Sequence, residues 1–339
     1  MKTLQDSPTT APARPALSLA TLAVAVSAAL SLAACGGGSD AAATNTGDTG
    51  GTGTSSSTAG VACSTSHSTY NASTSVLATS TATWSCSSSR RMLVSNGLPD
   101  HAVGTFPNPD CPNTIAAQSV SVSATLSPAV ASSSGNPTHV IGYAMNGVKF
   151  DPGTAGTCND SGSSCALGPG GGGNWNIEAL GQSSFNFGTD SSHAHVQPSG
   201  EYHYHGMPEG VIATLGKGKA MTLVGWAADG FPIYARYGYA AATDATSALK
   251  VLTASYQLKT TPDSGRPATS IYPMGTFTQD WHYVAGSGDL DECNGRTGVT
   301  PEFPQGIYHY LISETYPFIQ RCVKGTVSVG ALQFSAPAA

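Results

Sequence analysis

The stretch HAHVQPSGEYHYHG, residues 193–206, carries two His-x-His pairs on either side of a Pro-Ser-Gly turn. In a β-strand, alternate side chains point to the same face. The histidines of each pair therefore share a face, and the tyrosines around the second pair point to the opposite face. If the two runs pair across the turn, the stretch predicts a β-hairpin with four clustered imidazoles. The four residues are His193, His195, His203 and His205.

Four imidazoles this close together are unfavourable without a bound group. Protonation would place like charges together, and burial would leave ring nitrogens without hydrogen-bond partners. A transition-metal ion removes both problems, because imidazole is a suitable ligand for copper, zinc and iron. The four histidines therefore predict a site for one transition-metal ion, with Cu, Zn and Fe as candidates. The alternative is a row of exposed strand residues that bind nothing.

A second stretch, FPQGIYHYL at residues 303–311, repeats the Pro-x-Gly-x-Tyr-His-Tyr of the first. Leu311 replaces the second histidine, and His309 alone cannot chelate an ion as a pair can. We interpret the repeat as a strand-entry module that is used twice and carries a site only in its first copy. Chance recurrence of a turn and an aromatic strand is the alternative, and the sequence leaves open whether His309 joins the histidine cluster.

The rest of the chain consists of short runs of Val, Ile, Thr, Tyr and Trp that are separated by Gly, Pro, Asn and Asp. This composition is typical of strands joined by turns, with Asn146-Gly147 and Asp229-Gly230 as turn candidates. A helical turn or two is expected only over Asn174–Gly181. We predict a mainly β fold, a single loop-rich β domain with few short helices that is stabilised by disulfides.

The N-terminal residues predict an export signal. Residues 15–35 are apolar and uncharged and end in Leu-Ala-Ala-Cys, the pattern of lipoprotein processing, which makes Cys35 the expected lipidation site. An ordinary secretory signal with an incidental cysteine is the alternative. Residues 36–60 are almost wholly Gly, Ser, Thr, Ala and Asp, which predicts a disordered linker. The expected organisation is a lipoprotein signal peptide at 1–35, this linker at 36–60 and one folded domain at 61–339.

The expected location is therefore outside the cytoplasm, with lipid on Cys35 as the membrane anchor, in the outer membrane where the cell has one. Seven of the 8 cysteines follow Cys35, and in an oxidising compartment they are expected to form disulfides. Spacing alone does not fix the pairing. The pairs that we expect are Cys63 with Cys86, Cys158 with Cys165 and Cys293 with Cys322, which leaves Cys111 free.

Charge excludes some partners. The chain has 14 basic and 20 acidic residues, a formal net charge of −6, and its basic residues are scattered. Without a basic stripe there is no electrostatic basis for binding nucleic acid, so no nucleic-acid partner is expected. The sequence identifies no protein partner.

Carboxylates suggest further sites. Asp289, Asp291 and Glu292 form the densest acidic cluster, which is a candidate calcium site, although its spacing does not match an EF-hand loop. The fold could instead bring Asp291 or Glu292 to the histidines, and a solvated acidic turn beside Cys293 is equally compatible. Glu201, next to the hairpin turn, could orient a ligand or accept a proton.

At the Tyr202–His205 run the chain resembles the bacterial YHYH-domain family, which is named for this motif. The resemblance extends from about Asn96 and includes SNGLPDHAVGTFPNPDCPN, YAMNGVKFDPGTAG and LVGWAADGFPIYARYGY. It implies an extracytoplasmic protein and supports metal binding, but it implies no reaction. It also adds residues that could line the same pocket, which are Asn96, Asp100, His101 and Asp229.

These observations predict an extracytoplasmic, lipid-anchored protein that binds one transition-metal ion. The alternatives are a metal-dependent hydrolase or oxidoreductase of unknown substrate, and a metal-free structural or ligand-binding module. A closed set of four histidines would favour metal binding or storage. Three histidines with a vacant position would favour an enzyme.

Overall fold

The computed structural model describes residues 56–135, 140–168 and 172–327 of the chain. The predicted signal peptide, Cys35 and most of the predicted linker lie outside these residues. The described part is mainly β, as predicted, and its one α-helix is α1 (Glu209–Leu215). No helix in it is long and apolar enough to cross a membrane.

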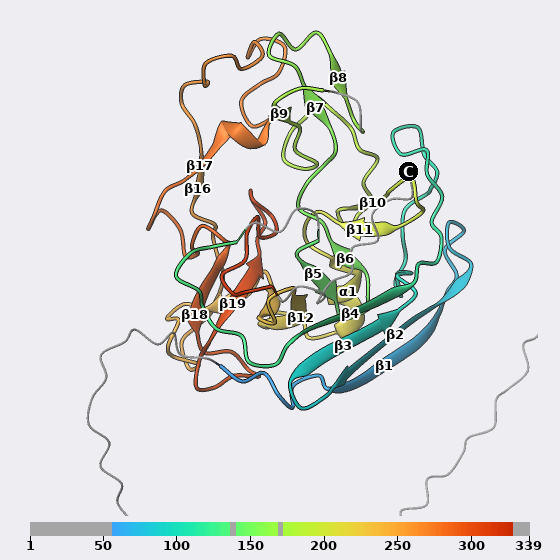
Figure 1. Cartoon of the computed structure of the whole chain (residues 1–339), viewed down its shortest axis with the longest axis vertical. Coiled ribbons are helices and arrows are strands. Elements are labelled where there is room, and N and C mark those ends of the chain that lie inside the picture. The colour runs from blue at the N-terminus through green and yellow to red at the C-terminus, as the bar shows by residue number, and fades with distance from the viewer. Residues whose placement is uncertain (1–55, 136–139, 169–171, 328–339) are drawn as a thin grey trace, which may run out of the picture. The chain divides into compact units, whose positions relative to one another are not determined.

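Four strands form an antiparallel meander in the order β1-β2-β3-β4 (Figure 1). Along β3 the side chains of Leu93 and Ser95 are buried, whereas Val94 between them is exposed, and Arg91 is buried on the same face as Leu93. This alternation gives the sheet one buried face, and Trp84 on that face donates from Nε1 to the carbonyl of Met145 at 2.9 Å. The strands are β1 (Ser64–Asn71), β2 (Ala78–Cys86), β3 (Arg90–Ser95) and β4 (Val120–Thr125).

The end of the predicted linker packs on this meander. Thr58 is buried, its hydroxyl donates to the carbonyl of Leu126, and its own carbonyl accepts from the buried guanidinium of Arg91 at 2.9 Å. The guanidinium also lies over the ring of Trp226, 3.4 Å from its centroid. Residues 56–60 are therefore held by the domain that follows them.

Eight strands form the second, mixed sheet, in the order β10-β11-β6-β5-β12-β13-β19-β18. Every residue of β12, β13 and β19 is buried, as expected for central strands that are covered on both faces. The strands in this order are β10 (Ala194–Val196), β11 (Tyr202–Tyr204), β6 (Lys149–Phe150), β5 (Gly142–Ala144), β12 (Thr222–Ala227), β13 (Pro232–Ala235), β19 (Ile307–Ile312) and β18 (Gly295–Gly298).

The eight strands fall into two equivalent halves. In each half a hairpin, β5-β6 or β12-β13, pairs in parallel with a Tyr-His-Tyr strand, β11 or β19, and an antiparallel strand lies outside it, β10 or β18. Both hairpins turn at the predicted glycines, Gly147 and Gly230, with φ of 81° and 91°. The repeated motif thus enters the sheet twice in equivalent positions, which confirms its interpretation as a module that is used twice.

The prediction of a helical turn over Asn174–Gly181 is wrong. Residues Trp175–Asn176 form strand β9, and the next two amides, of Ile177 and Glu178, donate to carbonyls of distant segments at 2.9 and 3.0 Å. Because these amides are satisfied by other parts of the chain, the segment is extended. The actual helix, α1, ends at Gly216, whose φ of 61° is typical of a glycine cap.

Short strands complete the fold. They form two antiparallel two-stranded sheets and a three-stranded sheet, in which β7 is central, and a 3₁₀ helix, η1, precedes β17. These elements are β14 (Tyr237–Tyr239) with β15 (Leu249–Val251), β16 (Tyr256–Leu258) with β17 (Trp281–Tyr283), β8 (Cys165–Ala166) with β7 (Thr157–Cys158) and β9, and η1 (Thr278–Asp280).

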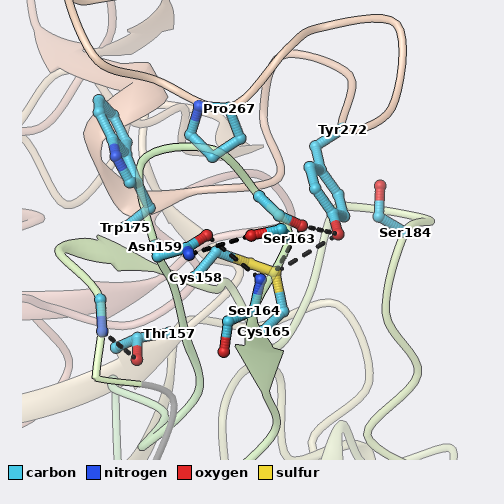
Figure 2. Close-up of a disulfide and its surroundings, with 12 residues drawn as sticks. Thr157, Cys158, Asn159, Ser163, Ser164, Cys165, Trp175, Ser184, Pro267 and Tyr272 are labelled. Carbon is cyan, nitrogen blue, oxygen red and sulfur yellow. Dashed lines mark hydrogen bonds between the residues drawn. A yellow bond between two sulfur atoms is a disulfide. The ribbon is translucent and has the colours of Figure 1, made fainter.

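Three disulfides join the cysteines in the expected pairs, Cys63–Cys86, Cys158–Cys165 and Cys293–Cys322, and Cys111 is free and buried. Figure 2 shows the second of them beside Tyr272, whose hydroxyl donates to the Gly162 carbonyl at 3.1 Å and lies 3.4 Å from Cys165 Sγ. Cys158 is fully buried in an aromatic cluster, which also contains Trp175, Ile177, Phe187 and Phe277.

The shortest and the longest of the loops closed by these disulfides allow a comparison of stability. Cys158–Cys165 spans 7 residues and Cys293–Cys322 spans 29, so loop-closure entropy predicts losses of about 2.5 and about 3.5 kcal/mol in the free energy of unfolding. We expect Cys293→Ser/Cys322→Ser to be the less stable variant in urea denaturation. A larger loss in Cys158→Ser/Cys165→Ser would show that packing around Cys158 outweighs loop closure.

Candidate metal centre

Three of the four predicted histidines converge. The Nε2 atom of His205 lies 2.9 Å from Nε2 of His203 and 3.0 Å from Nε2 of His195. The ligand atoms of the three residues all lie within 4.8 Å of one another, and among the described residues this is the only group of three or more His, Cys, Asp or Glu with such a geometry. The hairpin thus builds a three-imidazole site.

Strand pairing places these side chains. His195 on β10 and His203 on β11 are directly paired in the antiparallel ladder, so both imidazoles project from the same face. His205 stands two residues after His203, and its amide extends the ladder by donating to the His193 carbonyl at 2.9 Å. The alternation of side chains along β11 sends Tyr202 and Tyr204 into the hydrophobic core behind the site.

Hydrogen bonds leave lone pairs at the centre of the group. Nδ1 of His195 donates to the Phe187 carbonyl at 2.8 Å, and Nδ1 of His203 donates to the Glu201 carbonyl at 3.2 Å. Because a carbonyl oxygen only accepts, both rings carry their hydrogen on Nδ1 and present a bare Nε2. Nε2 of His205 carries at most one hydrogen and can donate it to only one of these two nitrogens. At least one of the two Nε2–Nε2 contacts therefore brings two lone pairs together without a hydrogen between them.

Burial keeps the imidazoles uncharged. It is the main cause that holds the pKa of His203 and of His205 well below the usual value of a histidine, and the neighbouring imidazoles and Lys149 lower it further. The pKa of His195 is also lowered, again mainly by burial. The group is therefore a set of neutral nitrogen donors, the form in which histidine binds a metal.

A transition-metal ion fits this donor set. At metal–nitrogen distances of about 2.0–2.1 Å, the ligand nitrogens of two imidazoles in a tetrahedral site stand about 3.3 Å apart. Two of the observed separations, 2.9 and 3.0 Å, are close to this spacing, and the ligand atoms of His195 and His203 lie within 4.8 Å of each other. Metal-ligating histidines commonly donate their other nitrogen to a backbone carbonyl, as His195 and His203 do. Three ligands of this kind leave a fourth tetrahedral position open.

His193 does not belong to the group. Its φ of 53° is left-handed and β10 begins only at the next residue, so the alternation of a strand does not include it. Its Nδ1 lies 3.0 Å from the Met207 carbonyl instead. The expectation of four converging imidazoles is therefore corrected to three.

A buried ion-pair network flanks the site. Lys149, on β6 and paired with His203 in the sheet, has only 5% of its surface exposed and lies 2.9 Å from Glu201 and 3.4 Å from Asp151. Glu201 thus neutralises a buried cation and is not among the three ligands. Sequence reasoning missed Lys149, although a lone lysine in the apolar run that follows Asn146-Gly147 was a signal.

Two of the pocket residues suggested by the family resemblance lie behind the histidines. His101 Nδ1 donates to the Ala102 carbonyl, so its Nε2 accepts from the hydroxyl of Tyr204 at 2.6 Å. Asn146 donates to the same hydroxyl at 3.0 Å and to Asp100 at 2.9 Å. This network fixes the tyrosine between two of the ligands.

The other suggested residues lie elsewhere. Asn96 bonds the backbone of Thr81 and Thr79 in the four-stranded sheet. Asp229 is fully buried and accepts from the hydroxyl of Tyr310. His309 lies on β19, in the other half of the large sheet, and is not part of the three-histidine group.

The acidic cluster has protein partners. Asp289 pairs with Lys250 at 2.6 Å, Glu292 pairs with Lys324, and Asp291 accepts from the hydroxyl of Tyr308 at 3.0 Å. The three carboxylates do not form a group of converging ligands within the described residues. Neither the calcium site nor the approach of Asp291 or Glu292 to the histidines is found in this arrangement.

A family model described as YHYH protein matches residues 121–325, which include both halves of the large sheet. No curated protein and no solved structure matches the chain.

Burial of His309 predicts a pH dependence of stability. Burial lowers its folded-state pKa from 6.5 to about 4. Between these two pH values His309 is protonated in the unfolded chain and remains neutral in the folded chain. The contribution of His309 to stability is then largest above pH 6.5, and about 3 kcal/mol of it is lost as the pH falls to 4. In urea denaturation we expect the wild type to lose this much more than His309→Phe. His282→Phe, at an exposed position, serves as the control, and a pH-independent difference between wild type and His309→Phe would contradict the prediction.

Proposed function

Because the chain belongs to the YHYH protein family, the motif that names the family is the place to look for function, and we propose that it holds a transition-metal ion. The ligands are the Nε2 atoms of His195, His203 and His205. The observation that carries the proposal is the convergence of three neutral imidazoles, two of them with bare lone pairs, at 2.9 and 3.0 Å. Zinc, copper and iron suit such a donor set.

The proposal includes a location outside the cytoplasm. Three disulfides suit an oxidising compartment, and the apolar leader that ends at Cys35 suits export and lipid attachment. The lipid on Cys35 is then the contact with the membrane, and residues 36–55 separate it from the first residue that packs in the fold.

A second candidate function, a metal-dependent enzyme, is favoured by the number of ligands. Structural zinc sites usually have four protein ligands, whereas catalytic sites have three and keep one position for water or substrate. The three-histidine group follows the second pattern. An ion held in this way would supply a Lewis acid and lower the pKa of a bound water. His203 and His205 are buried, whereas His195 is partly exposed, so access to the ion would be from the side of His195.

Metal content tests the proposal. After reconstitution with zinc and removal of excess ion, mass spectrometry of the domain from residue 56 is expected to find one equivalent in the wild type. His203→Ala/His205→Ala removes two of three ligands and is expected to carry less than a tenth of that amount. A wild type without metal after reconstitution with zinc, copper or iron would overturn the proposal.

His193 supplies the matched control. It lies in the same stretch as the ligands, but its ring is directed to the Met207 carbonyl, so His193→Ala is expected to retain one equivalent of zinc. Loss of the ion in this variant, at unchanged thermal stability, would show that the metal recruits a fourth imidazole.

The lipid anchor is tested separately on the full chain. In bacterial cells, wild-type protein is expected in the membrane fraction and labelled by radioactive fatty acid. Cys35→Ser removes the acceptor thiol and is expected to abolish the label and the membrane association. If Cys35→Ser stays in the membrane fraction, the anchor lies elsewhere.

A further inference from the structure

The two halves of the large sheet match in hydrogen bonding as well as in strand order. Asp190 precedes β10 and Asp291 precedes β18. The amide of Asp190 donates to the Ala194 carbonyl, and the amide of Asp291 donates to the Gly295 carbonyl, both at 2.8 Å. Both carboxylates also accept from the first tyrosine of the following Tyr-His-Tyr strand. The loops that lead into the outer strands are therefore equivalent.

Residues with unusual backbone angles match too. His193 and Asn294 stand at the same point of the two loops, with φ of 53° and 57°. The carbonyl of each accepts from the strand beside it at 2.9 Å, from the amide of His205 in the first half and of Leu311 in the second. This equivalence identifies position 311 as the counterpart of position 205.

The remaining site positions follow from the ladder. His195 pairs with His203 in the first half, and Arg296 pairs with His309 in the second. The counterpart of the three-histidine group is therefore Arg296, His309 and Leu311, which includes one histidine and two residues of other types.

The one histidine of this counterpart has the form of a metal ligand. Nδ1 of His309 donates to the Ile307 carbonyl at 3.1 Å, as Nδ1 of His203 does to the carbonyl two residues before it. Its Nε2 is therefore bare, and within the described residues this fully buried atom has no hydrogen-bond partner. A buried polar atom of this kind is costly unless something satisfies it.

We propose that the second half of the sheet is an incomplete metal site with one of its three ligands in place, and that its backbone holds a transition-metal ion when imidazoles stand at positions 296 and 311. The inference rests on the proposed function of the first half. The other two positions hold residues that bind no metal here. Leu311 fills its place with an apolar side chain in the core, and Arg296 directs Nη2 to the Tyr239 carbonyl at 2.7 Å.

Supplying the two ligands tests the proposal. We expect R296H/L311H to bind two equivalents of zinc where the wild type binds one, measured by mass spectrometry after reconstitution. R296H/L311H/H309A is expected to return to one equivalent, and R296H/L311H in the H203A/H205A background is expected to retain one. If R296H/L311H folds and still binds one equivalent, the inference is overturned and the proposed function stands. If the wild type binds none, the proposed function fails.

The converse exchange covers the case in which R296H/L311H does not fold. H195R/H205L gives the first half the residues of the second, and we expect it to fold with the circular dichroism spectrum of the metal-free wild type and to bind no zinc. If neither R296H/L311H nor H195R/H205L folds, the two halves of the sheet do not accept each other's side chains at the site positions, and the proposal is wrong.

Discussion

The antiparallel pairing of His195 with His203 is the contact on which the candidate site depends. Pairing at this register puts both side chains on one face, and the period of the strand adds His205 to them. A shift by one residue would send the imidazoles into the core and the tyrosines outward. The core contacts of Tyr202 and Tyr204 oppose such a shift. The packing of the tyrosines on one face of β11 therefore determines that the histidines lie on the other face.

The support of the site extends into the aromatic cluster. The carbonyl that orients His195 belongs to Phe187, whose ring also meets the imidazole edge to face, with the ring centroids 5.9 Å apart. Phe187 packs in the cluster that surrounds Cys158. The disulfide of the short loop thus stabilises the residues that hold the ring of a ligand.

Much of this arrangement was predictable, because it follows from local rules. Turn glycines and a period of two predicted the hairpins and three of the four imidazoles, and cysteine spacing suggested the disulfides. His193 was misassigned because its left-handed backbone depends on a loop that closes on Asp190, which alternation alone does not reveal. Asp289 and Glu292 pair with lysines that are distant in the sequence, and the segment after Trp175 is extended because its amides bond to distant carbonyls. Local sequence carries no signal for such long-range contacts.

Comparison of the two halves separates residues of the frame from residues of the site. Both halves have a glycine with positive φ before the Tyr-His-Tyr strand, Gly200 at 84° and Gly306 at 89°. In both, the hydroxyl of the second tyrosine bonds the first residue of the hairpin turn, Asn146 or Asp229. These features recur with and without a complete histidine group, so they serve the fold. The halves differ at the positions of His195 and His205, and these two residues therefore make one half a candidate metal centre. The tyrosines of the motif, Tyr202 and Tyr204, pack in the core of the sheet, and its histidines, His203 and His205, belong to the candidate site.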